Sequence, residues 1–198
     1  MSKSRLEAFS DGVLAIVITI MVLEAKVPHG DASLSALWPI APVCVSYGLS
    51  FLYLAIYWNN HHHMFHAAPR VDGRVLWANM NLLFWLSLVP FATGWMGENH
   101  FASWPTAFYG VVLFLAAIAY FILAQVLVAV NGRESALARA IGRDVKGRVS
   151  IVLYLIALPL AFLAGWIALA IYAIVAVMWL VPDRRIERAL SGDASGEH

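Results

Sequence analysis

Arg5-Leu6-Glu7-Ala8-Phe9-Ser10-Asp11 runs directly into the apolar stretch Gly12-Val13-Leu14-Ala15-Ile16-Val17-Ile18-Thr19-Ile20-Met21-Val22-Leu23, which ends at a second carboxylate, Glu24. The 12 residues between the two carboxylates cover only about 18 Å as a helix, whereas the hydrocarbon core of a bilayer is ~30 Å thick. A membrane-spanning helix here therefore places both carboxylates at the edges of the bilayer, where such groups usually mark a buried network or a pathway.

The composition of the whole chain predicts an integral membrane protein. Hydrophobic residues make up 62% of the 198 residues and charged residues only 13%, whereas soluble domains are about 45 to 50% apolar and about 25% charged. The length favours one domain over residues 1–198, with a short cytoplasmic tail from about residue 183. The net charge of +1 gives no reason to expect a nucleic-acid partner.

Six apolar segments are long enough, or nearly so, to span a membrane. They cover residues 5–26, 36–65, 74–95, 105–130, 148–164 and 166–182, and the last two form a tight hairpin near Gly165. With the N-terminus in the cytoplasm, 12 of the 13 Lys and Arg residues lie inside and only Lys26 lies outside. Because positive charge is retained on the cytoplasmic side, we expect an all-α protein of the plasma membrane with six transmembrane helices. Both termini are expected in the cytoplasm.

The first predicted helix has two different faces. At about 100° per residue, Ile16, Ile20 and Leu23 lie within some 60° of one another, with Thr19 at the margin of this stripe. The polar residues near its start point the other way; they are Glu7, Ser10 and Asp11. An aliphatic stripe of this kind is more often lipid-facing or helix-packing than pore-lining, so the pattern by itself leaves these alternatives open.

The polar face of this helix has possible partners at the same depth. The second segment ends in Trp58-Asn59-Asn60-His61-His62-His63-Met64-Phe65-His66. The third segment has Asn79 and Asn81 near its inner end. We expect Ser10 and Asp11 to join an interhelical hydrogen-bond network with members of this set, chiefly Asn59, His62, His63, Asn79 and Asn81. His62 and His66 have the i, i+4 spacing of a metal-binding pair, but no carboxylate or thiolate lies close in sequence, so interhelical hydrogen bonding is favoured and neither a metal nor a cofactor is expected.

The pattern Arg5-x-x-x-Phe9-Ser10-Asp11, at the inner end of the first of six helices, resembles the signature of the transmembrane protein 175 family of potassium channels. The Trp/Asn/His-rich end of the second segment resembles the same family. This resemblance implies a K⁺ channel whose pore is lined by helix one and which lacks the T-V-G-Y-G carbonyl filter of ordinary potassium channels. A chain with one such repeat is then expected to be a homotetramer embedded among membrane lipids.

The resemblance also implies roles for single residues. Ile16 matches an isoleucine that forms a hydrophobic constriction in the family, and Ile20 and Leu23 continue its face toward the outside. Thr19 matches a small hydroxyl residue linked to selectivity. The motif residues hold helix one against its neighbours and across subunits in the family; they are Arg5, Phe9, Ser10 and Asp11.

Two other classes of function compete with a passive channel. A secondary transporter would need broken helices near the midplane, and only Pro90 and Pro159 are candidate breaks, neither of them paired with glycine. An enzyme would need a catalytic signature, and the sequence contains no Ser/His/Asp set, P-loop or zinc motif. The chain is therefore not expected to be an enzyme, and the transporter is the alternative to the channel.

Overall fold

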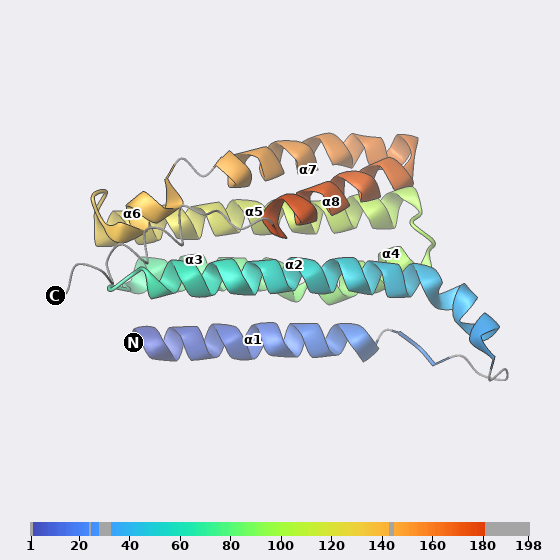
Figure 1. The fold of residues 1–198 in the computed structure, drawn as a ribbon, viewed down its shortest axis with the longest axis horizontal. Coiled ribbons are helices and arrows are strands. Elements are labelled where there is room, and N and C mark those ends of the chain that lie inside the picture. Colours follow the sequence, from blue (N-terminus) through green and yellow to red (C-terminus); the bar gives the residue numbers. More distant parts are fainter. Residues whose placement is uncertain (1, 24, 28–32, 143–144, 181–198) are drawn as a thin grey trace.

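The computed structural model describes residues 2–23, 25–27, 33–142 and 145–180, and these residues form a bundle of helices that lie side by side along one long axis (Figure 1). Glu24 and the predicted tail from about residue 183 lie outside the described residues. The elements are α1 (Lys3–Leu23), the 3-10 helix η1 (Leu34–Ile40), α2 (Ala41–His66), α3 (Gly73–Ser87), α4 (Val89–Glu98), α5 (Ser103–Asn131), α6 (Ala136–Ile141), α7 (Val145–Leu163) and α8 (Gly165–Leu180).

All six predicted segments are helical, although their bounds shift by a few residues. Among the described residues, five stretches are long and apolar enough to cross a membrane: α1, η1 with α2, α3 with α4, α5, and α7. The sixth, α8, is apolar but has 16 residues. It follows α7 after a single residue, Ala164, so the two form the expected hairpin. The short α6 lies in the polar segment between α5 and α7, where the sequence predicted no helix.

The third predicted segment consists of two helices rather than one. Pro90 lies in the first turn of α4, and proline cannot donate the backbone hydrogen bond that would continue α3. The chain adjusts over one residue, because Leu88 N donates to Trp85 O at 3.2 Å and Ala92 N donates to Leu88 O at 3.0 Å. Pro159, by contrast, lies inside an uninterrupted α7.

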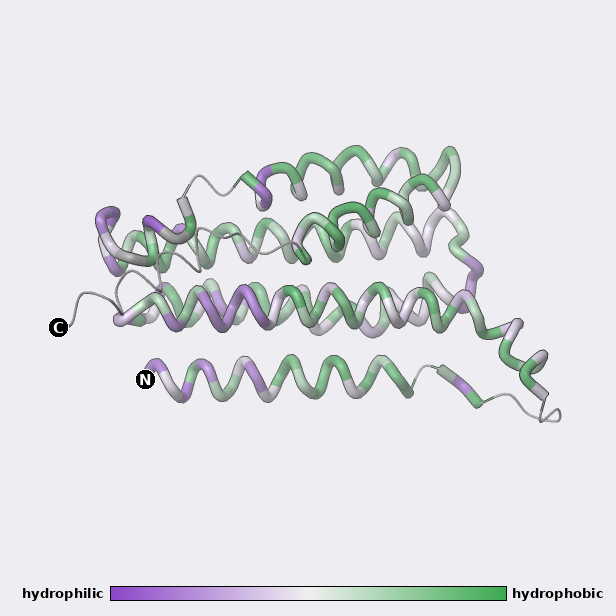
Figure 2. Tube along the Cα trace, in the orientation of Figure 1, coloured by the Kyte–Doolittle hydropathy of each residue, from purple (hydrophilic) through white to green (hydrophobic). Residues whose placement is uncertain are grey.

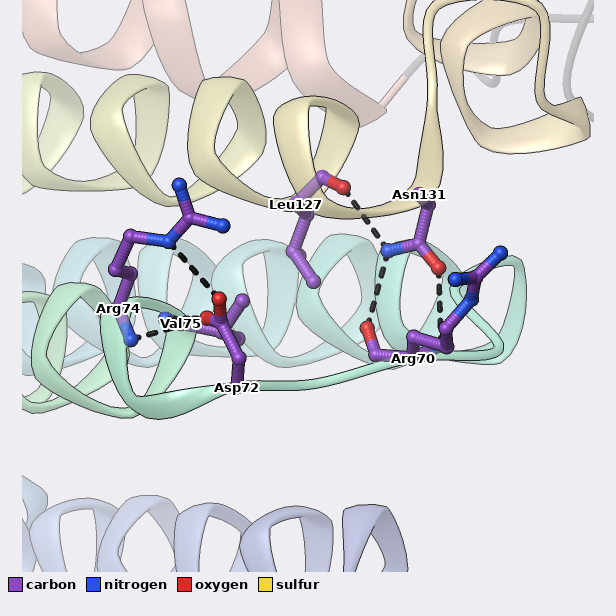
Figure 3. Close-up of polar contacts among 6 residues, drawn as sticks. All are labelled: Arg70, Asp72, Arg74, Val75, Leu127 and Asn131. Carbon is purple, nitrogen blue, oxygen red and sulfur yellow. Dashed lines mark hydrogen bonds and ion pairs between the residues drawn. The ribbon is translucent and has the colours of Figure 1, made fainter.

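The loop between α2 and α3 is fixed at both ends by side chains (Figure 3). Asn131, at the end of α5, accepts from Arg70 N at 2.9 Å and donates to Arg70 O at 3.0 Å. Asp72 caps α3 by accepting from the backbone amides of Arg74 and Val75. The Val75 amide, and after it the Arg74 side chain, lowers the pKa of the Asp72 carboxyl. This part of the loop is thus held in place before α3 begins.

Buried tyrosines pack the second half of the bundle around α5. Tyr53 from α2 donates to the backbone oxygen of Tyr172 in α8 at 2.5 Å, and Tyr172 in turn donates to Thr106 O in α5 at 3.2 Å. Gly110 lies directly against the Tyr172 hydroxyl, where a Cβ atom would clash. A glycine is therefore required at this position for α5 and α8 to approach so closely.

The first helix lies at the edge of the bundle, as Figure 1 shows, and touches only α2, α3 and α4 among the elements with substantial contacts. Hydrophilic residues gather at its N-terminal end and at the adjoining end of α2 (Figure 2). Its buried residues recur every three or four positions and form one stripe: Leu6, Ser10, Leu14, Val17 and Met21. Lys3, Glu7, Val13 and Ile18 are half-buried, and the other residues of α1 are exposed in the single chain.

Candidate functional site

The aliphatic stripe predicted on helix one is on the uncovered side of α1. The exposed fractions of Ile16, Ile20 and Leu23 are 59%, 44% and 77%. Apolar side chains this exposed on a membrane helix must contact lipid, a second copy of the chain, or a pathway. The three residues therefore share one accessible face, and their role in conduction stays a prediction.

Thr19 lies on the same exposed face and has its hydroxyl oriented by its own helix. Its Oγ1 donates to the backbone oxygens of Ala15 and Ile16, at 3.0 and 2.9 Å. A hydroxyl has a single proton and two acceptor lone pairs. Because the proton is directed to the backbone, the lone pairs remain available for a cation or a water on the exposed side.

The N-terminal part of α1 is attached through a buried chain of three polar side chains, which come from α1, α2 and α3. Asn79 Nδ2 in α3 donates to Ser10 Oγ at 2.9 Å, and Asn79 Oδ1 is 2.8 Å from His61 Nε2 in α2, which donates to it. The Ser10 hydroxyl donates a hydrogen bond to Leu6 O at 2.9 Å. All three side chains are buried, so the chain joins α1, α2 and α3 with its polar atoms paired, as an apolar medium requires.

The histidine in this network is His61, which corrects the prediction that named His62 and His63. Successive residues of a helix point about 100° apart, so only one of three consecutive histidines can face α3. His61 lies on the buried face with Leu54 and Phe65, seven residues before it and four after it, and this apolar spacing was the available signal that the prediction did not use. Among the described residues, no hydrogen bond links the side chains of Asn59, His62, His63 or Asn81 to this network.

Asp11 forms a different contact from the one predicted. Its Oδ1 accepts from Trp58 Nε1 at 3.0 Å, and the contact is exposed rather than buried with Ser10. Arg5 and Phe9 are also exposed, on the side of α1 that carries Ile16. Of the four motif residues, only Ser10 therefore takes part in the buried attachment within one chain.

A second attachment, near the C-terminal end of α1, was not found from the sequence. Met21 packs with its sulfur 4.0 Å from Thr93 Oγ1 in α4. Thr93 Oγ1 lies 2.7 Å from Ser50 Oγ in α2, which is 3.0 Å from the hydroxyl of Tyr109 in α5. Hydroxyl residues recurring within apolar helices were the available signal, but only the fold brings these three together.

The two attachments determine which face of α1 is uncovered. Ser10 and Met21 are 11 residues apart, roughly three helical turns, so they point in the same direction. With both of them bound to the bundle, Ile16, Thr19 and Ile20 have to point outward. The exposed ion pair between Lys26 Nζ and Glu98 Oε1, at 3.0 Å, adds little energy to this arrangement.

Known proteins share both the sequence and the fold of this chain. A potassium channel from Chryseobacterium sp. is 52% identical over 190 residues, which cover 96% of this chain and 98% of that protein. The family model that matches this chain, over residues 5–90, is described as the endosomal/lysosomal potassium channel TMEM175. The chain belongs to the TMEM175 family. The matched range contains Ser10, His61 and Asn79, whereas Thr93 and Tyr109 lie beyond it.

The solved structure of a TMEM175 protein supports the same fold. The crystal structure of a lysosomal potassium-selective channel TMEM175 homologue from Chamaesiphon minutus matches with a TM-score of 0.79 at 29% identity, covering 90% of this chain and 96% of that one. The endosomal/lysosomal proton channel TMEM175 of Danio rerio is 24% identical over 135 residues, which cover 66% of this chain but 25% of that protein. This TMEM175 chain is therefore a multi-pass membrane protein of a channel family, which is not a class of enzyme.

Proposed function

We propose that this chain is a potassium-permeable channel whose path is lined by the uncovered face of α1. The observation that carries the proposal is the division of α1 into a face packed against α2, α3 and α4 and a face whose large aliphatic side chains are exposed. Two bacterial relatives are named potassium channels, so K⁺ is the permeant ion that we propose.

The path requires several copies of the chain, because one helix encloses nothing. Closed cyclic symmetry around α1 is the simplest way to build a central path, and the family resemblance implies four copies. We propose a homotetramer in the plasma membrane, in which each chain crosses six times and both termini are cytoplasmic. The predicted distribution of Lys and Arg supports this orientation.

Conduction in this proposal depends on an apolar constriction. Ile16 side chains form the narrowest ring, with Ile20 and Leu23 toward the outside, and rings of this kind close a pore by dewetting. A K⁺ ion passes partly dehydrated. The Thr19 hydroxyls, whose protons are directed to the backbone, present oxygen lone pairs that replace part of the lost hydration and favour K⁺ modestly over Na⁺.

Two alternatives have specific support. The Danio rerio relative is named a proton channel, so H⁺ is the second candidate ion. A secondary transporter is the other alternative, since the chain breaks between α3 and α4. The residues at that break, Leu88, Val89 and Pro90, are apolar and mostly buried, whereas a transporter's unwound site supplies polar groups to its substrate.

A flux assay separates these three functions. Purified protein in liposomes is exposed in turn to K⁺, Na⁺ and H⁺ gradients, and the counter-movement is followed with a potential-sensitive dye. A channel for K⁺ gives flux down its own gradient with no need for a second ion. Flux that requires a co-transported or exchanged ion supports the transporter, and flux of H⁺ alone supports the proton channel.

The number of chains is tested separately by native mass spectrometry in mild detergents. Four copies of the 21.8 kDa chain are expected in one particle. A stable monomer across several detergents would exclude a shared pore and leave the transporter as the better account.

A further inference from the structure

Three aromatic rings form a ladder on the inner part of α2, on the side that the chain leaves uncovered. The ring centroids of His62 and His66 are 6.3 Å apart, and their planes differ by 23°. Trp58, one turn before His62, stacks on it with centroids 6.0 Å apart and planes 22° apart. All three side chains are exposed. The spacing of i, i+4 and i+8 places the rings in one row toward the inner end of the helix.

The two histidines of this ladder are not used by the network that holds α1. His61 alone takes that role, through Asn79. Within the described part of the chain, neither imidazole of His62 and His66 takes part in a hydrogen bond. Their ring nitrogens are therefore available to a ligand, although the sequence pattern favoured interhelical hydrogen bonding for the whole cluster and no metal.

We propose that His62 and His66 form a two-ligand site for a divalent transition-metal cation of the Zn²⁺ or Cu²⁺ type. The i, i+4 spacing on one helix face is the one that zinc-binding helices use, and imidazole suits these ions. Nitrogen ligands lie about 2.0–2.1 Å from Zn²⁺, which places the two ring centroids about 5 Å apart. The observed centroids need to approach by only about 1 Å, and exposed imidazoles rotate readily about χ2.

Both the ligand count and the charges make this a reversible surface site. Among the described residues, no group of three or more His, Cys, Asp or Glu side chains is arranged to hold a metal ion, so water completes the coordination by the two histidines. Lys3 Nζ donates to His66 O at 3.4 Å, which places a positive charge beside the pair. On the other side, the carboxylate of Asp11 accepts a hydrogen bond from Trp58 and supplies a negative charge. His63 lies beside His62, with its ring turned by 64°, and serves as the matched control.

The experiment measures zinc binding by the whole untagged protein in detergent. Isothermal titration with ZnCl₂ at neutral pH is done on the native protein and on His62→Gln, His66→Gln and His63→Gln. We expect one Zn²⁺ per chain, an affinity at least about tenfold weaker in either of the first two variants because one arm of the pair is lost, and no change in His63→Gln. All three side chains are outside the buried core, so the variants are expected to fold.

A thermal unfolding series gives an independent reading of the same site. Ligand that binds only the folded protein raises its melting temperature with concentration, so Zn²⁺ should raise Tm in the native protein and in His63→Gln, and not in the double variant His62→Gln/His66→Gln. Undiminished binding in the double variant, an equal loss in His63→Gln, one Zn²⁺ per four chains, or no binding by the native protein would each overturn the site. None of these readings depends on ion flux, so the channel proposal stands or fails separately.

Discussion

The amide of Asn79 in α3 donates to the hydroxyl of Ser10 in α1 at 2.9 Å, and both side chains are completely buried. This single contact connects the polar start of α1 to a helix 69 residues further along the chain. Through His61 the same amide reaches α2. Asn79 is therefore the central member of the attachment at the N-terminal part of α1, and its loss affects two partners together.

Replacing Asn79 with alanine should destabilise the protein. The substitution removes the donor to Ser10 and the acceptor of His61, and a buried polar group left unpaired costs about 1–3 kcal/mol. Thermal unfolding in detergent measures this loss against Asn81→Ala, which truncates an exposed asparagine two residues away. If both variants melt at the same temperature, the buried network does not hold α1.

Replacing Ile16 with asparagine should raise ion flux and weaken discrimination among cations. A polar side chain at the narrowest ring wets a constriction that an apolar ring keeps dry. The matched control is Ile174→Asn in α8, where the native isoleucine is 60% exposed compared with 59% for Ile16. Liposome flux of both variants is compared with the native protein, and unchanged flux and selectivity in Ile16→Asn would contradict a path lined by α1.

Thr19 is predicted to influence selectivity through its lone pairs. Thr19→Val keeps the shape of the side chain and removes the oxygen, so K⁺ and Na⁺ flux should become more nearly equal. Thr19→Ser retains a hydroxyl that can donate to the same backbone oxygens and should preserve the native preference. The ratio of K⁺ to Na⁺ flux in liposomes distinguishes the three proteins, and a serine variant that loses the preference as the valine variant does would show that the hydroxyl alone does not produce it.

Asp11 and Trp58 are expected to act as one unit in assembly rather than in selectivity. Asp11→Ala and Trp58→Phe break the same hydrogen bond from its two ends, so the double variant should lose little more than either single variant. The contact is exposed in one chain, and its cost there should be at most about 1 kcal/mol. The fraction of tetramer by native mass spectrometry is the measurement, and an intact tetramer with altered ion preference would place Asp11 in the path instead.

The choice of histidine shows where prediction from sequence stopped. Residues 61 to 63 are chemically identical, and the phase of one helix relative to another is determined by how their side chains pack. Counting apolar positions along α2 places residue 61 on the inner face with Leu54 and Phe65. This face of α2 is linked to α1 only because Asn79 of α3 lies between His61 and Ser10. The structure thus decided that His61, and not His62 or His63, is the histidine that bonds to Asn79.

The attachment of Met21 to Thr93 could not be predicted from the sequence for a related reason. Ser50, Thr93 and Tyr109 lie on α2, α4 and α5, and no spacing rule relates positions on three separate helices. The break between α3 and α4 was partly foreseeable from Pro90. Whether Pro90 would end the third span or only interrupt it could not be foreseen, because the neighbouring helices determine this.

The sequence by itself determined the membrane class, the six helical segments, the hairpin at Gly165 and the two faces of α1. Each of these follows from composition or from periodicity within one segment, where the geometry of a single helix is sufficient. The tertiary structure alone decided that Ser10 is buried while Asp11 is exposed with Trp58, that His61 is the partner of Asn79, and that Thr93 supports Met21. These are contacts between segments far apart in the chain, and their pairing depends on how whole helices pack to bury polar atoms away from lipid.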